Sequence, residues 1–226
     1  MQVYLSQLAF WEENMDSIQQ VSLNTLQRLP RYLNYLKALD GNDNVSSTEI
    51  AKALGLNDVQ VRKDLSSVSS GGRPKVGYKV SSLTEELKEF LGYNSLNRAI
   101  LIGAGNLGRA LMSYKGFEEY GLKIIAGFDC VEALVGCKVD DKPILSLNSV
   151  SDYCKKNGVR IGVITTPATG AQDACDLLVN AGVKAIWNFA PAHIIVPEGV
   201  LVQNENMACS LALLSKHLNE LLDGDK

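Results

Sequence analysis

Residues 99–108 read AILIGAGNLG, an apolar run followed directly by the spacing Gly-x-Gly-x-x-Gly. The run is typical of a buried strand, and the residues after it, through Tyr114, have the pattern of a helix. At such a turn Gly103 permits the tight bend, Gly105 lets the backbone approach a pyrophosphate, and Gly108 lets helix and strand pack closely. The helix N-terminus then faces the phosphate charge. We therefore predict a dinucleotide site on the backbone of Gly103, Ala104, Gly105, Asn106, Leu107 and Gly108.

The acid that such a site requires closes the next apolar run. Asp129 follows residues 124–128 and lies about 20 residues beyond the last glycine, where a carboxylate can bind the ribose hydroxyls. Residues 130–132 contain no arginine or lysine that could bind a 2′-phosphate. The pattern therefore favours NAD over NADP, and the alternative is a set of glycines at a tight turn that binds no ligand.

Short apolar runs alternate with helical stretches from Arg98 onward. The runs cover residues 100–102, 123–128, 161–165 and 185–189. Continuous Val/Ile-rich runs are typical of strands buried on both faces, as in a parallel sheet covered by helices. We predict an α/β domain of the Rossmann type, with a doubly wound parallel sheet, over residues 97–203.

The end of the chain, residues 207–226, has a heptad-like apolar seam on a predicted helix. Its members lie at alternating steps of four and three: Met207, Leu211, Leu214, Leu218 and Leu221. Because such a seam is buried only against another helix, this terminal helix needs a partner.

Apolar residues between Ser22 and Leu39 recur at steps of three and four, the spacing of one helix face. Pro30 interrupts this pattern. Because proline lacks the N–H and restricts the residue before it, it fits the first turn of a helix better than the middle. We therefore place the start of this helix near Leu29 and its end before the polar turn at residues 40–43.

Two capping patterns, at residues 46–49 and 57–60, predict two short helices separated by one tight turn. A glycine-rich turn at residues 71–75 and a short strand at residues 76–80 follow, and a further helix ends at Gly92. Helix, helix, turn, helix and hairpin is the element order of a winged helix.

The charge of the chain is unevenly distributed. Its 226 residues contain 22 Lys+Arg and 25 Asp+Glu, a formal charge of −3, in a composition typical of a globular protein. Residues 60–80 hold five cations and one acid, so they carry +4 and the remainder carries −7. Phosphate contacts need local cations, although a basic run is more often only a solvated face. Because this run coincides with the third helix and the next loop, we assign residues 21–92 to a winged-helix domain that binds double-stranded DNA.

The expected DNA contacts come from the exposed face of the third helix and from the tip of the wing. The helix would contact base edges and phosphates in the major groove, and the wing would reach the adjacent minor groove. Asp64 would orient a neighbouring cation. The predicted DNA-binding residues are Gln60, Arg62, Lys63, Ser66, Arg73 and Lys75.

The sequence offers no evident catalytic group. A nicotinamide dehydrogenase needs a proton donor or acceptor near the ring and usually a substrate domain. The two histidines, His193 and His217, have no orienting carboxylate close in sequence, so we assign no catalytic residue. A ligand-binding domain without catalytic apparatus is the favoured interpretation. The alternatives are a small NAD-dependent oxidoreductase with a helical dimerisation domain and a CoA- or nucleotide-binding subunit of a ligase.

Five cysteines are irregularly spaced and include no C-x-x-C pair. We assign neither a disulfide nor a metal site and expect small buried hydrophobic residues in a reducing compartment. No apolar run approaches the roughly 18 residues that cross a bilayer. The first residues lack a basic n-region and a cleavage site, so we expect a cytoplasmic protein without a membrane span.

Several motifs in this order resemble the Rex family of redox-sensing transcriptional repressors, over about nine tenths of the chain. They are LPRYL at 29–33, VRKDLS at 61–66, the glycine motif at 103–108, YKGF at 114–117 and NFAP at 188–191. The resemblance implies a homodimer whose terminal helix crosses to the other subunit. It also implies a repressor of fermentative and anaerobic metabolism that binds a palindromic operator with NAD⁺ or without ligand and is released by NADH.

The resemblance also assigns residues to the nicotinamide end of the site. Tyr114 and Phe189 match motif positions near the nicotinamide ring. Thr165, Thr166 and Pro167 match positions that line the same pocket.

Two regions depart from the family pattern. In the wing, Val68 and Gly71 replace aromatic residues and Pro74 replaces the usual arginine, so the wing should differ in shape. Residues 1–20 match nothing in the family, and we treat them as an N-terminal extension of unknown role.

Overall fold

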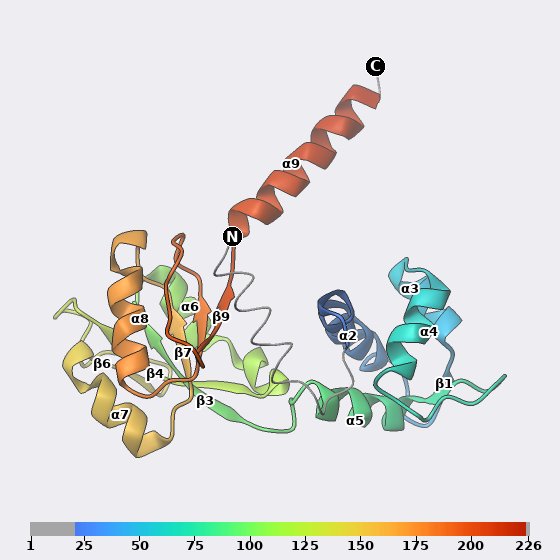
Figure 1. The fold of residues 1–226 in the computed structure, drawn as a ribbon, viewed down its shortest axis with the longest axis horizontal. Helices are drawn as coiled ribbons and strands as arrows, with labels where there is room; N and C mark the ends of the chain where they lie inside the picture. The colour runs from blue at the N-terminus through green and yellow to red at the C-terminus, as the bar shows by residue number, and fades with distance from the viewer. Residues whose placement is uncertain (1–20, 225–226) are drawn as a thin grey trace. The chain divides into compact units, whose positions relative to one another are not determined.

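The computed structural model describes residues 21–224, and the chain divides into two compact units, Met1–Ser95 and Leu96–Lys226 (Figure 1). The N-terminal extension, residues 1–20, lies outside the described residues. Within the described part, no helix is both long and apolar enough to span a bilayer.

The first unit combines helices with a two-stranded ribbon, as predicted for a winged helix. Its elements are α2 (Leu23–Leu36), β1 (Asn44–Val45), α3 (Ser47–Leu54), α4 (Asp58–Ser66), β2 (Tyr78–Lys79) and α5 (Val80–Phe90). β1 and β2 pair antiparallel. The strand expected at residues 76–80 is shorter because α5 already begins at Val80. The helices share one core, which includes the fully buried Leu29, Leu33, Ile50, Val61 and Leu65.

The predicted start of the first helix near Leu29 is wrong. α2 begins at Leu23, and Pro30 lies inside it. Because proline has no N–H, one intrahelical hydrogen bond is missing at this turn. The helix continues because the side chain of Ser22 caps its first turn and because side chains on both sides of Pro30 are buried. These buried residues are Thr25, Leu29, Tyr32, Leu33 and Leu36.

The second unit contains a sheet in the order β5-β6-β4-β3-β7-β8-β9. Its strands are β3 (Asn97–Ile102), β4 (Leu122–Asp129), β5 (Lys138–Val139), β6 (Lys142–Ser146), β7 (Ile161–Ile164), β8 (Ala185–Asn188) and β9 (Leu201–Asn204). All neighbours pair parallel except β5 and β6. Numbered along the chain, the parallel strands lie in the order 3-2-1-4-5-6, the doubly wound Rossmann order. The strand order reverses between β3 and β7, and ligands bind outside the carboxyl ends of strands at such a point.

Helices cover both faces of this sheet. The α-helices are α6 (Asn106–Ser113), α7 (Val150–Asn157) and α8 (Ala171–Asn180), and 3₁₀ turns occupy Lys115–Tyr120, Leu147–Ser149 and Ala168–Gly170. Ile100 and Ile102 of β3 belong to the core that contains residues of α7 and α8, whereas Ala99 and Leu101 belong to the core that contains Met112 of α6. The prediction of strands buried on both faces is therefore confirmed for β3.

Three strands were not predicted from the sequence: β5, β6 and β9. Only Ile144 is buried in β6, which also contains Pro143, and no residue of β9 is buried. Strands at or near a sheet edge are less completely covered by helices, so they do not need apolar residues on both faces. The continuous apolar pattern of the central strands is therefore absent from them.

The cysteine expectation holds for only two of the five. Cys154 and Cys175 are buried, but Cys130, Cys137 and Cys209 are exposed. The prediction that the cysteines are small buried hydrophobic residues is therefore wrong for the three exposed cysteines.

The terminal helix, α9 (Met207–Gly224), follows β9. Every member of its apolar seam, from Met207 to Leu221, is more than half exposed. A continuous exposed seam of this kind is typical of a helix that packs against a second chain.

Candidate nucleotide site and DNA-binding face

The glycine loop joins the carboxyl end of β3 to α6 at the reversal of strand order. Gly103 has φ +99°, and its N–H donates to the carbonyl of Phe128 at 2.8 Å. A Cβ at Gly103 would lie 2.9 Å from the backbone of Thr165 and Thr166, after β7. The bend therefore needs glycine for its conformation and for its close approach to the β7 loop.

The other two motif glycines have different surroundings. A Cβ at Gly108 would lie 2.1 Å from the carbonyl oxygen of Gly103 and 2.9 Å from Leu101, so this glycine permits close packing of α6 on β3. A Cβ at Gly105 would meet nothing within 4 Å. Gly105 is the N-cap of α6 and has no side-chain cap bond, so backbone N–H groups at this helix start are open to an anion.

Asp129 lies at the end of β4, next to the glycine loop. Its carboxylate accepts the N–H of Ala104 at 2.7 Å and that of Val131 at 2.9 Å. The side chain is buried, and its two hydrogen bonds hold the glycine loop in place. Its contact with ribose remains a prediction.

The loop after β7 supplies polar atoms to the same region. The hydroxyl of Thr165 donates to the carbonyl of Gly103 at 2.7 Å, which joins this loop to the glycine loop. The hydroxyl oxygen of Thr166 is buried without a hydrogen-bond partner among the described residues. Pro167 follows as the residue before a 3₁₀ turn. The open N-cap and the unpaired hydroxyl of Thr166 fit a polar ligand such as a dinucleotide.

Tyr114 and Phe189, the predicted nicotinamide neighbours, belong to one aromatic cluster. Tyr114 is the C-cap of α6, and Phe189 directly follows β8. Two further rings, Phe117 and Trp187, connect them by edge-on and tilted contacts with centroids 4.7 to 5.4 Å apart. These two connecting rings were not among the predicted site residues, although Phe117 lies in the YKGF motif.

The predicted DNA-binding residues of α4 lie on its solvent side. Arg62, Lys63 and Ser66 are exposed, and the buried face carries Val61 and Leu65, as the spacing predicts. The hydroxyl of Ser66 donates to the carbonyl of Lys63 at 2.9 Å, so its oxygen is left to accept from a base or an amide.

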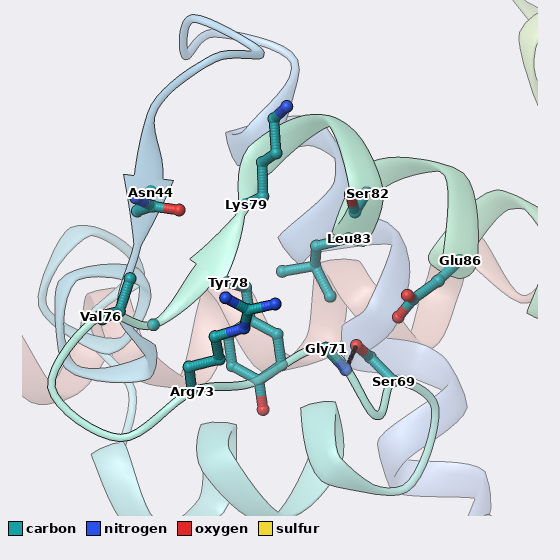
Figure 2. A pocket seen from close by; sticks show the side chains of 11 residues that line it. Asn44, Ser69, Gly71, Arg73, Val76, Tyr78, Lys79, Ser82, Leu83 and Glu86 are labelled. Carbon is teal, nitrogen blue, oxygen red and sulfur yellow. Dashed lines mark hydrogen bonds between the residues drawn. The ribbon is translucent and has the colours of Figure 1, made fainter.

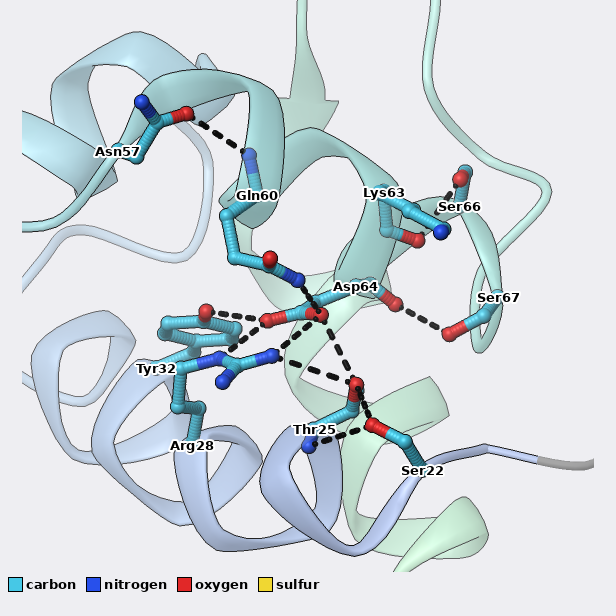
Figure 3. A network of polar contacts seen from close by, with 10 residues as sticks. All are labelled: Ser22, Thr25, Arg28, Tyr32, Asn57, Gln60, Lys63, Asp64, Ser66 and Ser67. Atoms are coloured by element: carbon cyan, nitrogen blue, oxygen red, sulfur yellow. Dashed lines mark hydrogen bonds and ion pairs between the residues drawn. The ribbon is translucent and has the colours of Figure 1, made fainter.

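Asp64 holds a cation, as predicted, but that cation is Arg28 of α2, and the carboxylate is the centre of a buried network (Figure 3). Its carboxylate accepts from Arg28 at 2.7 and 2.9 Å, from Tyr32 at 2.7 Å, from Gln60 at 2.8 Å and from Thr25 at 3.0 Å. Three of these donors come from α2, so the network fastens α4 to α2. The amide nitrogen of Gln60 is used here, so the predicted DNA contact of Gln60 would have to use its carbonyl oxygen.

The position of Asp64 in the sequence is a signal for this network. Asp64 lies three residues after Val61 and one before Leu65, on the apolar stripe of α4. An acid on such a stripe is buried only with partners, and Arg28 and Tyr32 provide them.

Burial alone would raise the pKa of Asp64, but the hydrogen bonds from Arg28, Tyr32, Gln60 and Thr25 lower that pKa from 3.8 to about 2. The pKa of Tyr32 is raised to about 12, first by burial and then by its bond to Asp64. The folded state therefore keeps the carboxylate ionised and the phenol protonated at neutral pH.

This depressed pKa predicts acid sensitivity of the first unit. The stabilisation is complete above the unfolded pKa of 3.8 and is lost as the pH falls through about 2. It amounts to about 2 kcal/mol for a shift of this size. Hydrogen exchange of residues 21–92, measured on wild type and on Asp64→Asn from pH 5 to 2.5, should show a difference that shrinks with falling pH. A difference independent of pH would contradict the assignment.

The wing is a tight loop closed by a backbone pair. The N–H of Arg73 donates to the carbonyl of Gly77 at 2.9 Å, and the N–H of Gly77 donates back to Arg73 at 2.9 Å. Lys75 at the tip has φ +65°. Between the wing, β2 and α5 lies a cavity of about 370 Å³, lined by residues that include Arg73, Tyr78 and Glu86 (Figure 2). Arg73 and Lys75, the two predicted contact residues of the wing, are both exposed.

Replacing Lys75 with glycine should move stability and DNA affinity in opposite directions. A left-handed conformation costs an L-residue roughly 1 kcal/mol, part of which glycine loses again in unfolded-chain entropy. We expect a gain of about 0.5 kcal/mol in the free energy of unfolding, a weaker affinity for DNA, and a salt slope smaller by about one. Urea unfolding and fluorescence anisotropy at several salt concentrations measure these quantities.

Lys75→Ala is the matched control because it removes the same charge and keeps the left-handed backbone strain. It should lose as much DNA affinity as the glycine variant without the gain in stability. Unchanged affinity in both variants would remove Lys75 from the DNA-binding face.

Family models match both units of the chain. Residues 20–66 match the model described as "Putative DNA-binding protein N-terminus", and residues 94–192 match the CoA binding domain. Two curated relatives are named Redox-sensing transcriptional repressor Rex. The protein of Porphyromonas gingivalis is 44% identical over 199 residues, which cover 87% of this chain and 91% of the relative. That of Clostridium kluyveri is 39% identical over 209 residues, which cover 92% of this chain and 100% of the relative.

Solved structures give the same result. The chain is similar to RSP in its complex with β-NAD⁺ and operator DNA, with 36% identity and a TM-score of 0.84, covering 91% of this chain and 96% of that one. It is also similar to RSP in complex with β-NADH, with 37% identity and a TM-score of 0.80, covering 91% and 99%.

Both the sequence relatives and the structural neighbours span nearly the full length of this chain. The relatives are transcriptional repressors, so the oxidoreductase and ligase alternatives have no support from them. The chain belongs to the Rex family of redox-sensing transcriptional repressors.

Proposed function

We propose that the protein is a DNA-binding transcriptional repressor that senses the NADH/NAD⁺ ratio. It binds a palindromic operator with NAD⁺ or without ligand, and NADH releases it. The observation that carries this proposal is the match over both units to a repressor structure that contains β-NAD⁺ and operator DNA. A protein with this function works where the operator DNA is, in the cytoplasm or nucleoid.

The nucleotide lies, in this proposal, along the carboxyl ends of β3, β4 and β7. The backbone from Gly103 to Gly108 holds the pyrophosphate at the start of α6, and Asp129 binds the ribose. Thr165, Thr166 and Pro167 line the pocket, and the unpaired hydroxyl of Thr166 supports this placement. No metal and no catalytic residue is required.

The nicotinamide end lies against Tyr114 and Phe189. When bound, the nucleotide supplies a ring that is charged and planar in NAD⁺ and neutral and puckered in NADH. Aromatic faces respond to that difference in charge because their quadrupoles attract cations. Tyr114 is 56% exposed, so its ring has room to pack against a ligand.

The operator is read by α4 and the wing. Lys63 and Ser66 face base edges in the major groove, and Arg62 holds a phosphate or a guanine. Gln60 also contacts the DNA, and Arg73 and Lys75 reach the adjacent minor groove. The exposed side chains of α4 and its rigid attachment to α2 through Asp64 support this assignment. Two such faces on a palindrome require a homodimer, for which α9 offers the apolar seam.

The test is operator binding by fluorescence anisotropy at fixed salt, without nucleotide, with NAD⁺ and with NADH. We expect weaker operator binding with NADH only. Shifting a two-state population from 1:99 to 99:1 requires about 5.5 kcal/mol of differential nucleotide affinity, which sets the upper scale of the effect. Equal operator affinity in NADH and NAD⁺ would refute redox sensing and leave a nucleotide-binding protein.

A further inference from the structure

Four aromatic rings form a continuous cluster from the C-cap of α6 to the residue after β8. Tyr114 and Phe117 meet at 4.8 Å with an interplanar angle of 77°, and Phe117 and Trp187 meet at 5.4 Å and 74°. Trp187 and Phe189 meet at 4.7 Å and 55°. The two end rings, Tyr114 and Phe189, are the predicted nicotinamide neighbours. If the ligand displaces Tyr114 it moves a ring in contact with Phe117, and if it displaces Phe189 it moves a ring in contact with Trp187.

Trp187 also contacts the segment that leads into α9. Its indole N–H donates to the carboxylate of Glu205 at 2.8 Å. The backbone N–H of Glu205 donates to the carbonyl of Asn188 at 2.8 Å, and the side chain of Asn188 donates to that of Asn204 at 2.9 Å. Residues 204 and 205 are therefore fastened to the end of β8, two residues before α9 begins at Met207.

Among the described residues, β9 is the last strand of the sheet and pairs with β8 alone. The direction in which the chain leaves β9 is therefore held by these few bonds at the end of β8. The hydrogen bond from Trp187 to Glu205 is charge-assisted. Of the three hydrogen bonds described above, it is the one whose donor is a ring of the aromatic cluster. A displacement of that ring changes the geometry of the bond and, with it, the exit of the chain towards α9.

We infer that the Trp187–Glu205 hydrogen bond is a positioning contact that couples the nicotinamide pocket to the dimerisation helix α9. The inference rests on the proposed function, because the coupling has meaning only if the pocket binds NADH. Neither residue is assigned to bind nucleotide or DNA. Their role is to transmit the position of the pocket rings to the base of α9.

The experiment uses the full-length dimer and measures three quantities for each variant: NADH affinity, operator affinity without ligand, and the ratio of operator affinities without and with NADH. Trp187→Phe keeps an aromatic ring and loses the donor, and Glu205→Ala loses the acceptor. Both should keep the first two quantities near wild type and reduce the ratio by roughly fivefold or more. The double variant should add little to either single variant, because both remove the same bond.

Glu205→Gln is the rescue, since its amide oxygen can still accept the indole N–H. It should restore most of the wild-type ratio. Wild-type ratios in Trp187→Phe and Glu205→Ala would overturn the inference. Loss of NADH affinity or of ligand-free operator binding in these variants would also overturn it, because the contact would then be merely structural.

A second readout keeps the test independent of the operator. Hydrogen exchange at residues 205–215 should change when NADH is added to wild type and should not change in Trp187→Phe. If wild type shows no operator release but this exchange responds, the proposed function fails and the coupling contact stands. If the exchange does not respond although NADH binds, the coupling contact is refuted.

Discussion

Replacing Asp64 with alanine is expected to lower the free energy of unfolding of the first unit by about 3 kcal/mol. The change leaves the hydroxyl of Tyr32, the guanidinium of Arg28 and the amide of Gln60 without their shared acceptor. Tyr32 is fully buried and the side chain of Arg28 is only 21% exposed, so water cannot fully replace the carboxylate. Hydrogen exchange of residues 21–92 measures the loss, and operator affinity should fall with it.

Asp58→Ala is the matched control for this prediction. Asp58 is an exposed acid in the first turn of the same helix, where it interacts favourably with the helix dipole. Its removal should cost only about 0.5 kcal/mol. The two variants should bind NADH equally well, because the nucleotide site lies in the second unit. If Asp64→Ala costs no more than Asp58→Ala, the network does not hold α4 on α2.

Gly105→Ala and Gly108→Ala should separate the two roles of the glycine motif. The methyl group at position 105 meets open space in the protein, and the backbone there has φ −69°. It would occupy the space that we propose for a bound phosphate. We expect unchanged or slightly raised stability and at least a tenfold loss of NADH affinity for Gly105→Ala. NADH fluorescence enhancement and urea unfolding measure the two effects.

Gly108→Ala should lower both quantities. Its methyl group would lie 2.1 Å from the backbone oxygen of Gly103, so α6 and the glycine loop must move apart. Overpacking of this kind costs about 1–3 kcal/mol, and the displaced loop should lose NADH affinity as well. NADH affinity at the wild-type level in Gly105→Ala would show that the open N-cap of α6 does not hold the phosphate.

The central sheet and the glycine loop were predictable because their sequence patterns are local. An apolar strand, three glycines at fixed spacing and an acid after the next strand determine β3, α6 and the end of β4. The strands β6, next to one edge of the sheet, and β9, at the other edge, were not predictable from such patterns, since they bury one residue or none. The start of α2 was misjudged because Pro30 weakens the helix locally while burial on both sides of it maintains the helix.

In the candidate sites, too, features set by residues close in sequence were predictable, and contacts between residues far apart in sequence were not. The exposed basic face of α4 follows from helical spacing and was predicted. The network of Asp64 joins it to residues of α2 that lie 32 to 39 positions away, and the Trp187–Glu205 bond joins a residue of β8 to the residue after β9, 18 positions apart. Those pairings depend on the packing of α2 on α4 and on the register of β8 with β9, which periodicity alone does not specify.

The central claim is that the nucleotide site and the DNA-binding face of this chain are thermodynamically coupled. The most direct test measures NADH binding. The dissociation constant of NADH is determined for the free dimer and for the dimer saturated with a palindromic operator. Because coupling is reciprocal, operator DNA should weaken NADH binding by the same factor by which NADH weakens operator binding, and should leave NAD⁺ binding unweakened. An NADH dissociation constant that is the same with and without operator would contradict the account.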